Sequence, residues 1–234
     1  MSAAVLGAGL LVAGCTAGPV KAGSAAIVGN ERITIATLDT EVTNLSQSAE
    51  NYPGTVHLTQ AQQTQQTLTW LVRFKINDEL ARQAGITVST AQAQKALAEI
   101  YAAAKASAQA QGISNVSLNL ILVANGIPPN LAAEVGRYQA IDDQFVRQAN
   151  GGQVPTSTSA QTATSAKLTQ ARCQAAKALE IQVNPQYGQL NYTQYQVVSA
   201  PNPVAAPPGA AKSPASPSPG STTAASPSGQ TPAC

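Results

Sequence analysis

The sequence predicts a mainly α-helical domain, and two kinds of pattern lead to this prediction. First, apolar residues recur at steps of three and four along several stretches, as on one face of an amphipathic helix. Second, Thr59 and Ser89 are each followed three residues later by glutamine, Gln62 and Gln92, which is the pattern of a capping box at a helix start. Aromatic residues make up only 4% of the chain, so the core must consist mainly of Leu, Ile, Val and Ala, which suit packed helices.

The domain opens with a predicted β-hairpin followed by a helix. Two short apolar pieces within residues 25–34 flank Gly29-Asn30, which is a turn signal. The helix that follows is predicted from four apolar residues at helical spacing, which are Ile35, Leu38, Val42 and Leu45.

The longest predicted helix begins after Thr59 and ends at Ala84, where Gly85 closes it. Trp70 and Phe74 lie one turn apart on one flank of this helix, and they are candidates for binding a client polypeptide. Core packing is the more frequent role of such a pair. Another face carries Leu68, Leu71, Val72, Ile76 and Leu80. Because apolar residues cover much of its circumference, the helix is either central in the bundle or exposes one face to a ligand.

Three further helices follow the long one in the chain before a polar linker at 151–164. The second capping box starts the first of them, which ends at Gly112. A short apolar helix at about 116–124 supplies the remaining candidates for client binding, which are Leu118, Ile121 and Leu122. The third helix is expected to start at the Pro128-Pro129 pair and to end near Asn150.

The C-terminal part contains one more helix, strand-like pieces and a tail. The helix is predicted at 165–178, a strand-like run at 179–183 and a final extended piece at 192–198. Residues 199–234 are rich in Pro, Ser and Ala and cannot bury enough apolar area to offset the entropy lost on ordering, so we expect a disordered tail. The helical domain is therefore predicted to span residues 25–198, linker included.

The N-terminus carries a motif that ends in Cys15. The apolar run before it is shorter than the roughly 20 residues that span a bilayer, but it has the length of a signal-peptide core. The segment Leu11-Val12-Ala13-Gly14-Cys15 resembles the lipobox of bacterial lipoproteins. The resemblance implies that residues 1–14 are removed, that the Cys15 sulfur is lipidated, and that a tether at 15–24 holds an extracytoplasmic domain on the cell membrane. Because no Lys or Arg precedes the run, we expect the natural start to lie upstream of Met1.

Two further cysteines, Cys173 and Cys234, remain after Cys15 is assigned to lipid. Outside the cytoplasm two such thiols can form a disulfide, but the sequence leaves both the pairing and its absence open.

Two segments resemble the SurA and PrsA family of extracytoplasmic chaperone-isomerases. The stretch AAIVGNERITIATLDTEVTNL at 25–45 is similar to the opening of these proteins, and VNPQYG at 183–188 is similar to their closing VNPRYG element. The resemblance implies a bundle like the SurA N-terminal domain, with a short N-terminal hairpin and a C-terminal strand-like segment. It also implies that the partners are unfolded or newly exported polypeptides.

The chain lacks the part of this family that performs catalysis. Members with isomerase activity carry a parvulin domain and its histidines before the closing element, whereas this chain has one histidine, His57, in a predicted loop. We therefore expect a chaperone-like lipoprotein that is not an enzyme. The alternatives are a lipoprotein that docks one folded envelope partner and, as a second alternative, a protein with residual prolyl isomerase activity.

Other kinds of chemistry find little support in the sequence. The net charge is +2 without a block of one sign, so we expect no nucleic-acid partner. His57 has no companion at metal-ligand spacing, so neither a metal nor another cofactor is expected. Asp142 and Asp143 are neighbours on a helix and do not face one another, so a solvated helix face is the better interpretation.

Overall fold

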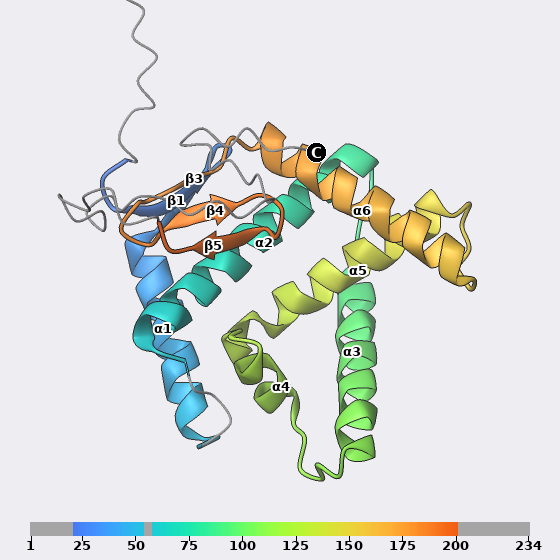
Figure 1. The fold of residues 1–234 in the computed structure, drawn as a ribbon, viewed down its shortest axis with the longest axis horizontal. Coiled ribbons are helices and arrows are strands. Elements are labelled where there is room, and N and C mark those ends of the chain that lie inside the picture. The colour runs from blue at the N-terminus through green and yellow to red at the C-terminus, as the bar shows by residue number, and fades with distance from the viewer. Residues whose placement is uncertain (1–20, 54–57, 201–234) are drawn as a thin grey trace, which may run out of the picture.

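A computed structural model of the chain describes residues 21–53 and 58–200. The predicted signal peptide, Cys15, His57, Cys234 and the predicted tail from residue 201 onward lie outside these ranges. The described part is mainly helical with small antiparallel sheets, as the sequence predicts (Figure 1).

The helices and strands come in the following order along the chain. The helices are α1 (Ile35–Glu50), α2 (Gln60–Ala84), α3 (Thr90–Ala110), α4 (Leu118–Ala124), α5 (Ala132–Ala149) and α6 (Thr158–Ala178), with a 3-10 turn, η1 (Pro129–Leu131), before α5. The strands are β1 (Ser24–Val28), β2 (Glu31–Thr34), β3 (Gln182–Val183), β4 (Gln189–Asn191) and β5 (Gln196–Val198).

Both predicted capping boxes form. The backbone nitrogen of Thr59 donates to Gln62 Oε1 at 2.9 Å, and that of Ser89 donates to Gln92 Oε1 at 2.8 Å. Gly85 closes α2 with a φ of 67°, a left-handed conformation that glycine adopts without steric cost. The bounds of the long helix are therefore set by local chemistry.

The first and last parts of the domain meet in one sheet. Its strand order is β2-β1-β3, all antiparallel, with Ala26 opposite Val183 and Ile27 opposite Gln182. Asn184 extends this junction, because its backbone nitrogen donates to the Ala25 carbonyl at 2.9 Å and its Nδ2 donates to the Ser24 carbonyl at 3.0 Å. The two segments at 25–45 and 183–188 are thus side by side in space.

The structure corrects the predicted linker at 151–164. Helix α6 begins at Thr158, inside that range, and Ser157 caps it by accepting a hydrogen bond from the Ala160 nitrogen at 3.2 Å. The prediction was wrong because the buried side of α6 consists of small or weakly apolar residues, and these give no strong apolar period. They are Thr164, Cys173, Ala175 and Ala176.

The C-terminal strand predictions are also corrected. Only Gln182–Val183 of the run at 179–183 is a strand, because Leu179 still belongs to the end of α6 and Glu180 turns the chain with a φ of 45°. The predicted extended piece at 192–198 is instead the turn and second strand of a hairpin, β4–β5. Asn191 Oδ1 stabilises that turn by accepting from the nitrogens of Thr193 and Gln194, a local bond that strand patterns do not reveal. At the other end, Ser24 of the predicted tether is fully buried in β1.

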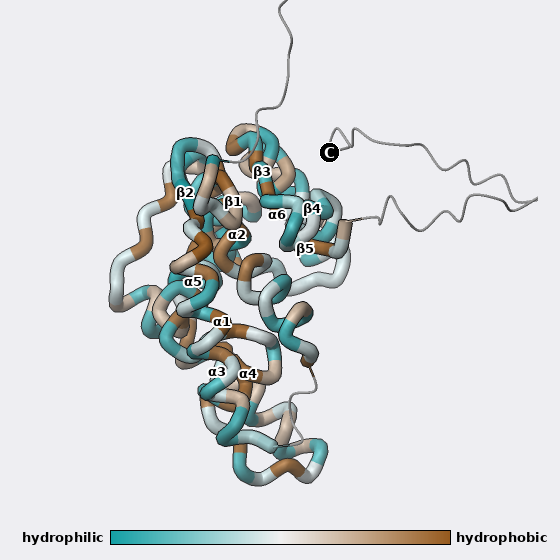
Figure 2. Tube along the Cα trace, turned by 90° about the vertical axis from the view of Figure 1, so that its left-hand side faces the viewer, coloured by the Kyte–Doolittle hydropathy of each residue, from teal (hydrophilic) through white to brown (hydrophobic). Residues whose placement is uncertain are grey.

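Two apolar clusters fill the interior, and α2 contributes to both. Viewed from the side, the strands gather at one end of the molecule and α3 and α4 lie toward the other (Figure 2). The larger cluster joins the sheets with α2 and α6, and includes Ala26, Leu38, Val72, Ile76, Ala176 and Val197. The smaller cluster joins α2, α4 and α5, and consists of Phe74, Leu122, Ile127, Leu131 and Val135.

We predict that Asn184→Ala destabilises the domain by about 1–3 kcal/mol, because a hydrogen bond between two distant parts of the chain is lost and the partly buried Ser24 carbonyl loses a donor. Urea unfolding measures this change. Asn51→Ala is the matched control, since its side chain bonds only carbonyls of its own exposed helix end, and it should change stability by less than about 0.5 kcal/mol. Equal effects of both variants would contradict the importance of the junction.

Candidate functional site

Trp70 and Phe74 form an aromatic trio with Tyr138 of α5. The ring centroids lie 5.8 Å apart for Trp70 and Phe74, 6.0 Å for Trp70 and Tyr138, and 6.2 Å for Phe74 and Tyr138. Phe74 is buried, whereas Trp70 is partly exposed and its Nε1 donates to the Asn125 carbonyl at 3.2 Å. Of the two predicted aromatic candidates, only Trp70 is therefore exposed enough to contact a ligand.

Two of the three α4 candidates, Leu118 and Leu122, belong to the same cluster. Leu122 is buried beside Phe74, Leu118 packs against the cluster from its edge, and Ile121 is half-buried on the same helix. Among the described residues, the large apolar side chains that are exposed are Ile113 and Val154, and neither is a predicted site residue. The apolar side chains of α4 thus mainly complete a core.

A cleft lies beside Trp70 between α2, the end of α4 and β5. Its volume is about 360 Å³, and we call it the glutamine cleft because most of its lining is amide side chains. Its walls are Gln62, Gln65, Gln66, Thr69, Trp70, Arg73, Asn125, Gln196 and Val197. The sequence does not predict this cleft, because no pattern in it indicates that residues 194–199 lie against α2.

Arg73 fixes the end of this cleft. Its guanidinium carbon lies 5.1 Å from the centroid of the Trp70 ring, and its Nε and a terminal nitrogen donate to the carbonyls of Tyr195 and Gln194, both at 2.9 Å. Burial lowers the pKa of Arg73. Because an arginine side chain stays protonated in proteins, Arg73 nevertheless bonds the two hairpin carbonyls as a cation. Arg73 therefore covers part of the indole and ties α2 to the β4–β5 turn.

A buried ion pair between α5 and α6, Asp142 with Arg172, lies against Tyr138. Arg172 bonds the Asp142 carboxylate through a terminal nitrogen and Asn77 Oδ1 through Nε at 3.4 Å, and its guanidinium carbon lies 4.9 Å from the Tyr138 ring centroid. Asn77 in turn donates to the Tyr138 carbonyl at 2.9 Å. This group of side chains joins α2, α5 and α6.

The interpretation of Asp142 as a solvated residue was wrong, since it is only 8% exposed. Asp143, its neighbour, points elsewhere and accepts from Gln139 Nε2 at 2.9 Å, because successive helix residues face different directions. Burial raises the pKa of Asp142 to about 6 and outweighs the opposing effect of Arg172. One carboxylate oxygen, Oδ1, is buried and has no hydrogen-bond partner among the described residues.

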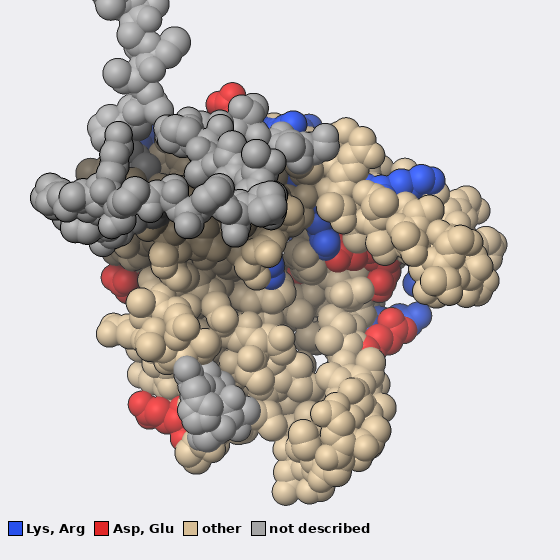
Figure 3. Space-filling view, viewed as in Figure 1, with Lys and Arg blue, Asp and Glu red and all other residues tan. Residues whose placement is uncertain are grey.

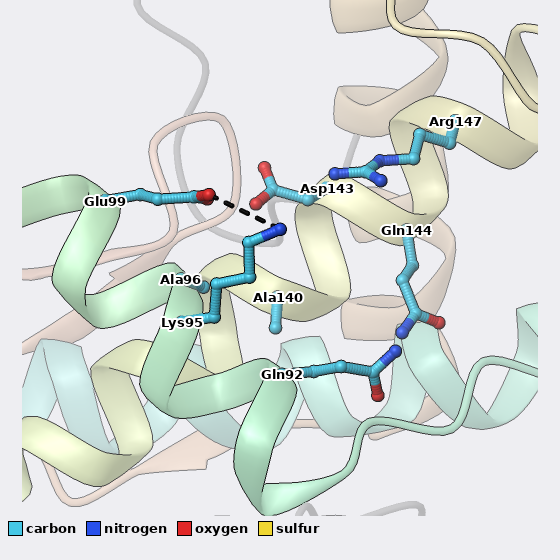
Figure 4. A pocket seen from close by; sticks show the side chains of 8 residues that line it. All are labelled: Gln92, Lys95, Ala96, Glu99, Ala140, Asp143, Gln144 and Arg147. Atoms are coloured by element: carbon cyan, nitrogen blue, oxygen red, sulfur yellow. Dashed lines mark ion pairs between the residues drawn. The ribbon is translucent and has the colours of Figure 1, made fainter.

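A second hollow, between α3 and α5, has charges of both signs. Figure 4 shows Arg147 and Lys95 reaching toward Asp143, while Lys95 also pairs with Glu99 at 3.7 Å. On the face seen in Figure 3, charged side chains gather near the crossing of α3, α5 and α6 and leave wide uncharged areas elsewhere. Because opposite charges compensate in this hollow, its electrostatics do not favour a charged ligand of either sign.

Comparisons of the chain with protein-family profiles, curated sequences and solved structures found no match. No described helix combines the length and apolarity needed to cross a membrane. Within residues 21–53 and 58–200, no three side chains of His, Cys, Asp or Glu gather as metal ligands do. Cys173 is buried and disulfide-bonded, while Cys234 lies outside the described ranges, so their pairing stays a prediction.

We predict that the stability of the protein falls by about 1–1.5 kcal/mol between pH 5 and pH 7.5 through Asp142. The folded state binds the Asp142 proton more tightly, so this stabilisation is fully present below the unfolded pKa near 3.8 and is lost as the pH rises through about 6. Urea unfolding at both pH values measures it. Asp142→Asn should flatten this pH dependence and Asp143→Asn should retain it; a slope that persists in Asp142→Asn would show that another group is responsible.

Proposed function

We propose that the protein is a membrane-anchored extracytoplasmic chaperone-like lipoprotein, which binds unfolded or newly exported polypeptides without catalysis. The observation that carries the proposal is the junction of β1 with β3. The two segments that resemble the ends of SurA and PrsA chains are far apart in the sequence, yet they pair in one sheet against a helical bundle. That arrangement supports treating them as ends of one domain of this kind.

The glutamine cleft is the part of the described surface that best suits a polypeptide client. It combines amide groups with one partly exposed aromatic residue, Trp70, which is also one of the predicted client-binding residues. Apolar burial contributes about 25 cal/mol per Å², so a few client side chains would offset only part of the ordering cost. Binding by this protein is therefore weak and tolerant of sequence.

We predict that the purified protein, at several-fold molar excess, delays the aggregation of a chemically denatured client on dilution. Light scattering measures the delay. Because no covalent chemistry is involved, the delay should grow with protein concentration and should need no nucleotide. An equal excess of a folded protein of similar size is the control, and a scattering curve that coincides with that control would contradict the proposal.

A second candidate function, docking of one folded envelope partner, is favoured by a specific observation. Leu122 and Val123 of α4 are buried, and the larger apolar residues around them close a small core instead of lining an open groove. Affinity purification from solubilised membranes separates the two functions. A single partner recovered at one-to-one stoichiometry supports docking, whereas many unrelated exported chains support the chaperone-like function.

The lipid anchor is tested separately, at Cys15. We predict that cells fed labelled palmitate incorporate the label into the natural protein and into Cys173→Ala, but not into Cys15→Ala, because only Cys15 follows the lipobox-like segment. Acyl chains contribute about 0.8 kcal/mol per buried methylene, so two or three chains would hold the protein on the membrane. Absence of label from the natural protein would contradict the anchor without bearing on the cleft.

A further inference from the structure

One row of side chains on α2 already holds strand β5 of this chain and the residues that flank it. Arg73 donates to the Tyr195 carbonyl at 2.9 Å, Thr69 Oγ1 accepts from the Val197 nitrogen at 2.9 Å, and Gln65 Nε2 donates to Ser199 Oγ at 3.1 Å. From Arg73 to Thr69 to Gln65 the position on the helix falls by four residues each time. The position of the bonded residue in the C-terminal segment rises by two each time. The helix and the segment therefore run antiparallel in a fixed register.

The register follows from the two repeat lengths. A helix rises about 1.5 Å per residue, so side chains four residues apart are separated by about 6 Å along its axis. An extended chain rises about 3.3 Å per residue, so groups that point to the same side recur at about 6.6 Å. A row of polar side chains at helical spacing can thus meet every second residue of an extended main chain.

A second row with the same spacing lies next to the first, and it lines the glutamine cleft. It consists of Gln62, Gln66 and Trp70. The side chain of Gln66 makes no hydrogen bond to any described residue, and Gln62 uses only its Oε1, in the capping box. Gly126 leaves the space for Gln66, since an added Cβ there would lie 1.8 Å from Gln66 Oε1. The row therefore has amide donors available for a ligand.

We propose that this second row binds the main chain of an extended polypeptide segment from outside the protein, in the way that Arg73 and Thr69 of the first row bind the main chain at Tyr195 and Val197. The Nε2 groups of Gln62 and Gln66 donate to alternate carbonyls of that segment, and the Gln196 amide faces it from the β5 side of the cleft. The edge of Trp70 contacts one of its side chains. This inference rests on the proposed function and names the feature of the client that the site recognises, its backbone.

The lining favours a polypeptide over the other neutral ligands that amides bind. A sugar ring stacks on an open aromatic face, but the guanidinium of Arg73 lies over the Trp70 ring and Phe74 and Tyr138 crowd it from within. Among the described residues, Arg73 is the one charged side chain in the lining, and it is already bonded to two carbonyls, so the cleft does not select a charged ligand. Recognition of a repeating backbone through amides is also consistent with the proposed tolerance of the protein for different client sequences.

The test measures binding of a fluorescent, uncharged twelve-residue peptide of Ala, Ser and Thr by anisotropy, with the full-length protein. We expect Gln66→Leu to weaken binding about fivefold, the effect of losing one hydrogen bond. Gln62→Glu, which keeps the capping acceptor but removes the donor, should weaken it similarly. Gln60→Leu is the matched control on the same helix outside the cleft lining, and it should bind as the natural protein does. Circular dichroism confirms that each variant is folded.

Further arms of the experiment identify what the site recognises. Scrambled peptides of the same composition should bind within about twofold of one another, since a backbone contact is the same in each. Unchanged binding in Gln66→Leu and Gln62→Glu, or competition by a neutral hexasaccharide, would overturn the inference. If the natural protein and the two glutamine variants bind the peptide equally well, the proposed function stands but the inferred site is wrong. If the natural protein binds no peptide and delays no client aggregation, the proposed function and the inferred site are both wrong.

Discussion

The pairing of β1 with β3 is the constraint on which the rest of the structure depends. It brings the start of the domain to residues more than 150 positions later, and it is short: two residues of β3 face β1, with Asn184 continuing the contact. This small contact is stable because β1 and β3 pack on the same apolar core, together with α2 and α6. The Gly29 nitrogen, which donates to the Leu179 carbonyl at 2.6 Å, anchors the hairpin tip to the end of α6.

Helix α2 connects this sheet to helices α1, α5 and α6. It contacts α1, α5, α6, β1 and β5, so nearly every side of it is in use. Its apolar residues supply both clusters, while its polar residues act as ligands for other parts of the backbone: Asn77 for Tyr138, Arg73 and Thr69 for residues of the β4–β5 hairpin. Asn77 and Thr69 are buried polar residues of this helix, and their hydrogen bonds lower the cost of burying them.

Much of the helical framework could be predicted from the sequence, whereas the cleft could not. The boundaries of α2 followed from local rules, a capping box at Thr59 and a left-handed glycine at position 85. The start of α6 was missed because Ala, Ser and Thr give no strong apolar period, and the burial of Asp142 was missed because the position of α6 is a tertiary property. The cleft needs β5 beside α2, a contact across more than 120 residues that leaves no local pattern. Four of the five predicted client-binding residues do meet in one cluster, since helical spacing fixed their common direction on each helix.

The early strand and the late strand also impose an order on folding. A chain made from its N-terminus presents the β1–β2 hairpin first, with one edge of β1 unpaired until the residues around Gln182 have emerged. A two-stranded hairpin alone is only marginally stable in water, so the helices must assemble before this edge is closed. Until β3 has emerged, the growing domain therefore exposes an incomplete sheet to its surroundings, and a strand that follows all six described helices in the chain completes it.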